Sequence, residues 1–127
     1  MKWKFSNDAP IYAQLMEQIK AAIVTGQFPP GERLPSVRDL AAEAGVNPNT
    51  MQRAFAELER EGLVHSRRTS GREVTDEQTV IDRTKADLAS RHVAQFFSAM
   101  GALGYSAREA ADVIMQAVER SESNERT

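Results

Sequence analysis

The sequence predicts a mostly α-helical fold with one small β-hairpin, followed by a separate pair of C-terminal helices. Three observations lead to this fold class. Helix start signals precede apolar residues at helical spacing, two predicted helices are joined by only about three residues, and one stretch has the turn residues of a hairpin. A chain of 127 residues with 41% apolar content can bury one modest core and a small appendage, but not two full domains.

The first predicted helix covers about residues 10–25. Pro10 suits the first helical position, because the fixed φ of proline already matches a helix. Gly26 provides a left-handed C-terminal cap. The apolar residues that recur every four positions are Ile11, Leu15, Ile19 and Ile23.

A short second helix is predicted over about 37–44. Ser36 and Asp39 stand in the spacing of a capping box at its start, and Gly45 closes it. A third start signal follows at once, with Asn47 as N-cap and Pro48 as the first helical residue. Two helices joined by about three residues that include glycine have the spacing of a helix-turn-helix.

The third helix has an apolar stripe and ends at Gly62. The stripe consists of Met51, Ala54, Phe55 and Leu58. Residues 63–68 and 72–75 then predict two strands joined by a basic, glycine-containing tip at 69–71. A hairpin directly after a helix-turn-helix predicts a winged helix-turn-helix.

Two further helical segments follow the hairpin. The polar residues 76–80 predict a boundary, so we expect a winged helix-turn-helix domain over 1–76 and a helical hairpin over 77–127. The first of the two helices is expected to break near Gly101 and Gly104, and Ser106 with Glu109 forms a capping box for the second. The charged residues 121–127 are expected to fray.

The predicted hairpin is the expected dimer interface. Two amphipathic helices cannot enclose a core between themselves, so their apolar stripe needs a partner surface, and a second copy of the chain supplies one. The predicted interface residues are Leu88, Phe96, Phe97, Met100, Val113 and Ile114.

The charge distribution favours local contact with DNA over general coating of nucleic acid. The net charge is −2, but residues 33–72 hold seven arginines against five acidic side chains. The reading helix of a helix-turn-helix lies in the major groove, and the segment after Asn47 has polar side chains opposite its apolar stripe. The candidate DNA contacts are Arg33, Ser36, Arg38, Asn47, Asn49, Thr50, Gln52, Arg53, Arg68, Gly71 and Arg72.

The chemistry of these side chains suggests a role for several of them. Asn49 and Gln52 can form paired hydrogen bonds with adenine, and Arg53 can contact guanine or phosphate. Structural alternatives remain open, because Arg53 could simply pair with Glu57 one turn later, and Ser36 and Asn47 are also helix caps.

Catalysis, metal binding and membrane insertion are not expected. The chain has no cysteine, and its two histidines lie in different predicted units, so no nucleophile, catalytic base or metal cluster is suggested. No cofactor motif occurs, and no apolar run approaches the roughly 18 residues of a membrane helix. We expect a cytoplasmic protein that is not an enzyme.

Residues 10–74 closely resemble the winged-helix domain of the GntR family of bacterial regulators. The short tail resembles the YtrA-type subfamily, and the wing departs from the usual Gly-x-Gly-Thr-Phe-Val by reading Thr69-Ser70-Gly71-Arg72-Glu73-Val74. The resemblance rests on Pro10-Ile11-Tyr12, Gly31-Glu32-Arg33-Leu34-Pro35-Ser36-Val37-Arg38, Leu40-Ala41, Gly45-Val46-Asn47-Pro48-Asn49-Thr50, Arg53-Ala54-Phe55 and Leu58-Glu59-Arg60-Glu61-Gly62-Leu63-Val64.

The resemblance implies a homodimeric repressor that binds an inverted-repeat operator, with an adjacent transporter operon as the leading target. It implies DNA contacts at six of the candidate positions, namely Arg38, Asn47, Asn49, Thr50, Gln52 and Gly71. The alternative is a winged helix that serves only as a protein-interaction adaptor. The short tail leaves little room for a ligand cavity of about 300 Å³, so we expect no metabolite pocket within one subunit, and the sequence names no effector.

Overall fold

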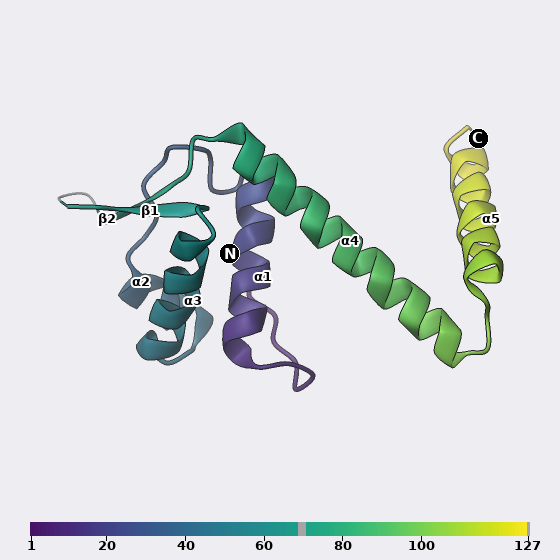
Figure 1. The fold of residues 1–127 in the computed structure, drawn as a ribbon, viewed down its shortest axis with the longest axis horizontal. Coiled ribbons are helices and arrows are strands. Elements are labelled where there is room, and N and C mark those ends of the chain that lie inside the picture. Colours follow the sequence, from purple (N-terminus) through teal and green to yellow (C-terminus); the bar gives the residue numbers. More distant parts are fainter. Residues whose placement is uncertain (69–70, 127) are drawn as a thin grey trace. The chain divides into compact units, whose positions relative to one another are not determined.

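The computed structural model describes residues 1–68 and 71–126, and over these residues it confirms the predicted fold class. The tip of the predicted wing, residues 69–70, lies outside the described residues. Helices and strands follow one another as Figure 1 labels them. Their bounds are α1 Ile11–Val24, α2 Val37–Ala44, α3 Pro48–Arg60, β1 Val64–Arg67, β2 Gly71–Val74, α4 Gln78–Ala102 and α5 Ala107–Arg126.

The helix boundaries of the N-terminal part follow local capping chemistry. The Ser36 hydroxyl accepts a hydrogen bond from the Asp39 N–H at 3.0 Å, and Gly45 closes α2 in the left-handed conformation at φ 72°. The Asn47 side chain accepts from the Asn49 N–H at 2.8 Å and starts α3, with Pro48 in the first turn. The turn between α2 and α3 is therefore only three residues long, 45–47.

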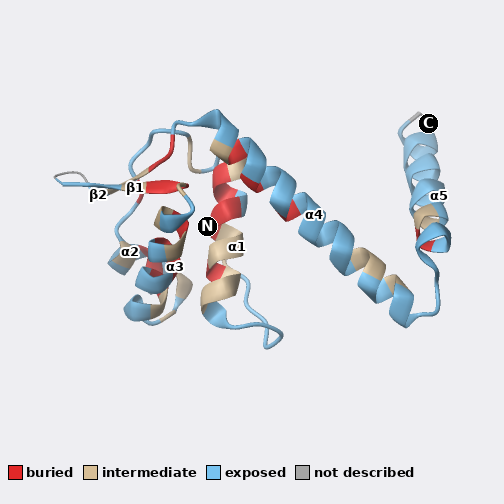
Figure 2. Cartoon of the chain, in the orientation of Figure 1, coloured by how far each residue is buried: buried red, intermediate tan, exposed pale blue. Residues whose placement is uncertain are grey.

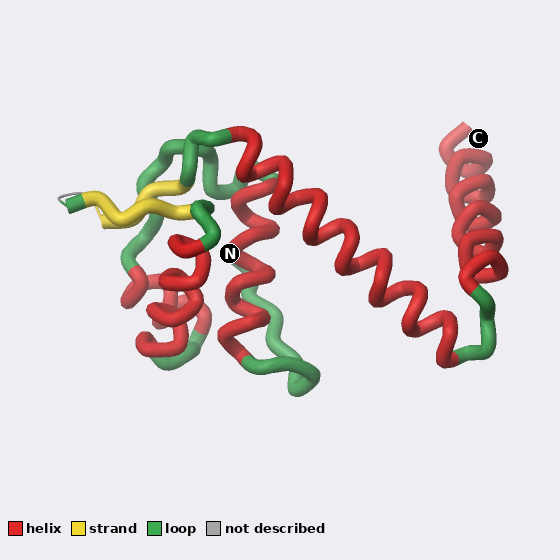
Figure 3. The backbone as a smooth tube through the Cα atoms, viewed as in Figure 1, coloured by secondary structure: helices red, strands yellow, loops and turns green. Residues whose placement is uncertain are grey.

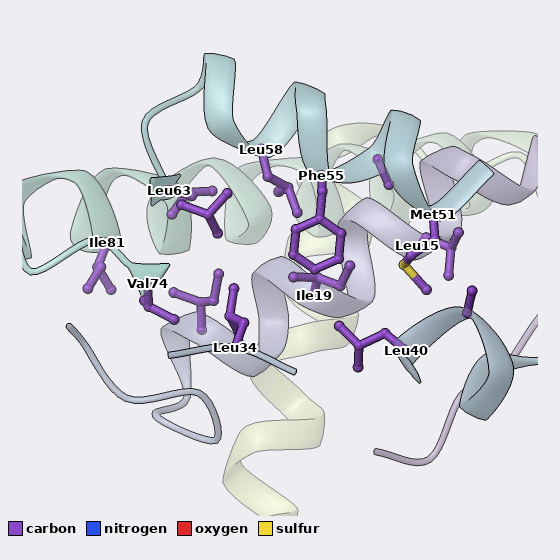
Figure 4. Packing of buried hydrophobic residues seen from close by; sticks show 14 residues of the cluster. Leu15, Ile19, Leu34, Leu40, Met51, Phe55, Leu58, Leu63, Val74 and Ile81 are labelled. Atoms are coloured by element: carbon purple, nitrogen blue, oxygen red, sulfur yellow. The ribbon is translucent and has the colours of Figure 1, made fainter. Parts of the chain in front are cut away.

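The core lies where α1 and α3 pack together and α2 and the hairpin close the remaining sides. Phe55 of α3 is fully buried and points toward Ile19 of α1 in Figure 4. Leu15, Leu40 and Val64 are equally inaccessible. Because each element contributes its apolar face to this one cluster, the polar faces of α2 and α3 are left at the surface, as Figure 2 shows.

The wing is an antiparallel pair that gains a third segment from earlier in the chain. Val64 pairs with Val74, and Arg67 pairs with Gly71, across β1 and β2 (Figure 3). Residues 31–34 run along the other edge of β2, where the Leu34 N–H donates to the Arg72 carbonyl at 2.9 Å and the Val74 N–H donates to Glu32 at 2.9 Å. This added segment ties the loop before α2 to the wing.

Residues 1–9 lie along α1. The Gln18 side chain both accepts from the Lys4 N–H at 2.9 Å and donates to the Lys4 carbonyl at 2.8 Å. Gln14 bonds the backbone of Ser6 in the same two-way manner. The Trp3 indole packs against the core and donates to Glu43 of α2 at 3.2 Å.

The chain divides into two compact units, Met1–Leu88 and Ala89–Thr127. The first part of α4 belongs to the first unit, and its Ile81 joins the winged-helix core. In the second unit, Phe96 and Phe97 make an edge-to-face contact with ring centroids 5.5 Å apart, and Ala110 of α5 is buried.

One sequence expectation about the C-terminal helices is confirmed and one needs correction. α4 ends at Ala102, directly after Gly101, and the turn that follows includes Gly104 at a φ of 94°, so the predicted break near these two glycines is confirmed. The predicted fraying from residue 121 was wrong, because α5 continues to Arg126. No glycine or proline interrupts this charged end, so nothing in the local sequence stops the helix.

Candidate nucleic-acid interface

The exposed face of α3 carries the polar side chains that the sequence identified. Met51, Phe55 and their apolar neighbours face the core, whereas Asn49 and Gln52 on the other side are exposed. Thr50 is half-buried beside them. The helix can therefore enter a groove without exposing core residues, which is the division of faces that a reading helix needs.

Two candidate contacts also hold the ends of helices. The Ser36 hydroxyl and the Asn47 amide oxygen are both used as N-caps, as described above, and both residues remain exposed. Arg38, in the first turn of α2, is exposed as well. The start of a helix favours an anion through its free N–H groups and its dipole, so the position of Arg38 suits a backbone phosphate.

The guanidinium of Arg53 lies over an aromatic ring from another helix. Its guanidinium carbon is 3.9 Å from the centre of the Tyr12 ring, in the first turn of α1. The alternative partner, Glu57, instead binds Arg60 with Nη2 to Oε2 at 2.6 Å, and this contact lowers the pKa of the Glu57 carboxyl. Sequence reasoning missed Tyr12, although the Pro10-Ile11-Tyr12 motif had marked its position.

The arginines in and beside the wing differ in their exposure to solvent. Arg33 and Arg68 are exposed, and Gly71 begins β2 with a φ of 78°, a conformation that favours glycine. Arg72 points inward: its guanidinium carbon lies 5.6 Å from the centre of the Phe55 ring, and its Nε is buried without a hydrogen-bond partner among the described residues.

A glutamate fixes the wing to the reading helix. Glu59 of α3 accepts a hydrogen bond from the Ser66 N–H of β1 at 2.9 Å. This bond stabilises the charged carboxylate and lowers the pKa of Glu59, with a smaller contribution from the positive charge of Arg72. The hydrogen bond between Ser66 and Glu59 therefore helps to fix the orientation of the wing relative to α3.

Within 1–68 and 71–126, no cluster of three histidine, aspartate or glutamate side chains could hold a metal ion. In the same residues, no helix is both long and apolar enough to cross a membrane.

Comparison with known families identifies this arrangement. A sequence model described as bacterial regulatory proteins, gntR family, matches residues 11–74, which make up half of the chain and contain α1, the helix-turn-helix and the wing. The chain belongs to the GntR family. This confirms the family assigned from the sequence motifs.

Two relatives from Bacillus subtilis show how far the GntR similarity extends. The HTH-type transcriptional regulator YhcF is 37% identical over 84% of this chain and 88% of its own length. The HTH-type transcriptional repressor YtrA is 41% identical over 55% of this chain and 54% of its own length. Similarity to YhcF therefore continues beyond the winged helix into the C-terminal helices.

Solved structures agree with this assignment. A GntR family transcriptional regulator from Listeria monocytogenes is 35% identical and superposes with a TM-score of 0.78, covering 88% of this chain and 98% of its own. The DNA-binding domain of AraR, in complex with operator ORX1, is 29% identical with a TM-score of 0.51, covering 59% of this chain and 92% of its own. This GntR-family chain is a DNA-binding transcriptional regulator of the helix-turn-helix type, and its relatives are regulators and not enzymes.

Proposed function

We propose that the protein is a homodimeric repressor that binds an inverted-repeat operator. In this proposal, residues 1–76 read the DNA, and residues 77–127 join two subunits. The observation that carries it is the combination of an exposed polar face on α3 with a C-terminal unit whose apolar side chains are uncovered in one chain.

The uncovered side chains come from α4, from the turn after it and from α5. Leu103 is 74% exposed, Met115 is 55% exposed and Val93 is 53% exposed. Ile114 and Val118, which lie one turn apart on α5, are also exposed. Exposed apolar side chains gathered in one unit of the chain favour a protein partner, and a second copy of the same unit is self-complementary by two-fold symmetry.

The predicted interface residues differ in how far they are buried within one chain. Phe96, Phe97, Met100 and Val113 are half-buried, so each retains surface for a partner. Leu88 is already buried at 7% exposure, so its part in a dimer is smaller than that of the others. Ile114 is exposed, and the four other exposed residues of the previous paragraph join the proposed interface.

On the DNA side, we assign base reading to Asn49 and Gln52 and backbone contact to Arg38. The wing residues Arg33 and Arg68 are placed at the flanking backbone. AraR supports operator binding by this kind of domain, since its DNA-binding domain is solved on an operator. YtrA, which is named a repressor, supports repression as the outcome.

Selection of bound duplexes from a random pool tests the proposal. We expect an inverted repeat, because a two-fold protein dimer matches a two-fold DNA site. Gln52→Ala should lose preference at one base pair in each half-site, whereas Arg38→Ala should bind every sequence more weakly. Selected sites without dyad symmetry would contradict the proposal of a dimer that reads two half-sites. If the protein shows no salt-dependent binding to any duplex, the result favours the protein-interaction adaptor.

Light scattering tests the assembly. Ile114→Asp combined with Val118→Asp introduces two charges on one face of α5 and should convert a dimer into a monomer, since buried unpaired charges are strongly unfavourable. Gln116→Asp, on the opposite side of the same helix, is the matched control and should remain dimeric. A double variant that stays dimeric rejects this interface.

A further inference from the structure

A cleft of about 430 Å³ lies between the first turns of α1 and α3. None of the residues that line it is acidic, and four of them carry side-chain hydrogen-bond donors. The lining residues are Pro10, Ile11, Tyr12, Asn49, Thr50 and Arg53. A cleft with one positive charge, several donors and no carboxylate suits an anion.

The cation in this cleft is held in place. The guanidinium of Arg53 lies 3.9 Å from the centre of the Tyr12 ring, well within the distance of a cation–π contact. A planar guanidinium that lies on a ring keeps the N–H groups at its rim available for a second partner. Glu57, one turn along α3, pairs with Arg60 at 2.6 Å, and the charge of Arg53 makes a smaller contribution to lowering the pKa of Glu57.

The position of Arg53 indicates whether it contacts a backbone phosphate or a guanine base. Arg53 and the neighbouring Gln52 are both exposed, but the contact with Tyr12 places Arg53 on the side of α3 that faces α1. A helix in the major groove meets base edges along its leading face and the sugar–phosphate backbone along its flanks. The flank position therefore favours a phosphate over guanine.

We propose that this cleft seats one phosphate of the DNA backbone, and that Tyr12 is a positioning residue that orients Arg53 toward it. Arg53 makes the charged contact, with Thr50 as a neighbouring donor. The site links α1 to the DNA and gives the first helix a role besides packing. This inference rests on the DNA binding in the proposed function, but it does not depend on an inverted repeat.

The test measures anisotropy of a fluorescein-labelled duplex of arbitrary sequence at several salt concentrations. Arg53→Ala should reduce the slope of log affinity against log salt by about one per subunit, because one phosphate contact is lost. Tyr12→Leu should weaken binding about two- to fivefold, the loss that corresponds to an exposed cation–π contact. Tyr12→Phe keeps the ring and should bind like the wild type.

A double-variant comparison separates positioning from a structural effect. Tyr12→Leu should have no further effect on binding when Arg53→Ala is already present, because the residue that it orients is gone. Equal weakening in both backgrounds would overturn the positioning role. Thermal unfolding of each variant shows whether the fold is intact, and the phenylalanine variant provides the comparison if the leucine variant is unstable.

The outcomes also separate this site from the wider proposal. If Arg53→Ala leaves the salt slope unchanged but alters preference among selected sequences, Arg53 reads a base and the phosphate site is wrong. A wild type that binds duplexes without dyad preference contradicts the dimeric operator instead, and the salt slopes then still decide the phosphate site.

Discussion

At the scale of single residues, similar side chains have different surroundings. Arg38 and Arg68 are exposed, Arg53 lies on Tyr12, and Arg72 points toward Phe55. All four are equal as positive charges in the sequence, yet only those with free N–H groups at the surface can reach DNA. Substitutions of these arginines should therefore have different effects.

Arg38→Ala should weaken duplex binding at least about tenfold while leaving the unfolding temperature unchanged, because the variant loses charge-assisted hydrogen bonds and no core packing. Arg38 is exposed, so its truncation leaves no cavity. Arg83→Ala removes the same charge from an exposed position on α4 and is the control. Equal binding of the two variants would remove Arg38 from the DNA contacts.

Glu59 gives a prediction about acid stability. Its pKa is lowered in the folded protein by the hydrogen bond from Ser66, so it contributes stability above the pH at which a free glutamate titrates, about 4.3. This contribution is lost as the pH falls through the lower, folded pKa. Chemical denaturation should therefore show that the wild type loses free energy of unfolding relative to Glu59→Gln as the pH falls below about 5. A difference that is independent of pH would show that the bond to Ser66 does not favour the ionised form.

At the scale of elements, capping chemistry fixes where the helix-turn-helix begins and turns. Ser36 caps α2 through the Asp39 N–H, and Asn47 caps α3 through the Asn49 N–H. Both caps lie beside the surface that is proposed to meet DNA. Stability and binding can be separated at Ser36, because aspartate is also a good N-cap.

Ser36→Ala should lower the free energy of unfolding by about 1 kcal/mol, the usual cost of a lost N-cap. Ser36→Asp should retain the wild-type stability, but it should bind duplexes more weakly if phosphate lies at this helix start, because two negative charges then approach. Urea denaturation and anisotropy measure the two effects. An alanine variant as stable as the wild type would show that the cap does not stabilise α2.

At the scale of the whole molecule, the two units have different requirements for stability. The unit Met1–Leu88 contains the buried core, whereas the unit Ala89–Thr127 has most of its apolar side chains exposed. The first has the contacts of a self-sufficient fold, and we propose that a second copy of the chain covers the apolar surface of the second. Dimerisation should therefore affect DNA affinity more than the fold of the winged helix.

The variant that combines Ile114→Asp with Val118→Asp should bind a selected full site at least about a hundredfold more weakly than the wild type. In a dimer, binding of one half-site raises the effective concentration of the second subunit at the other half-site, and a monomer lacks this gain. Binding to an isolated half-site should be unchanged, since the reading surface is intact. Titration of both duplexes gives the comparison. A monomer that binds the full site as tightly as the wild type would separate DNA binding from dimerisation.

Local features of the fold follow directly from short stretches of the sequence. The starts of α2 and α3 follow from Ser36 and Asn47, because a capping side chain bonds an N–H only two or three residues away. The hairpin and the family motifs are equally local, so the fold class and the helix-turn-helix were predicted, and the DNA contacts stay predictions.

Only the tertiary structure decided which side chains meet across elements. Tyr12 and Arg53 lie 41 positions apart in the sequence, and the contact of residues 31–34 with β2 joins segments about as distant. Arg72 and Arg68 are alike in the sequence, but the guanidinium carbon of Arg72 lies 5.6 Å from the centre of the Phe55 ring, whereas Arg68 is exposed. Such contacts depend on how apolar faces pack into one core, and no short stretch of sequence contains that information.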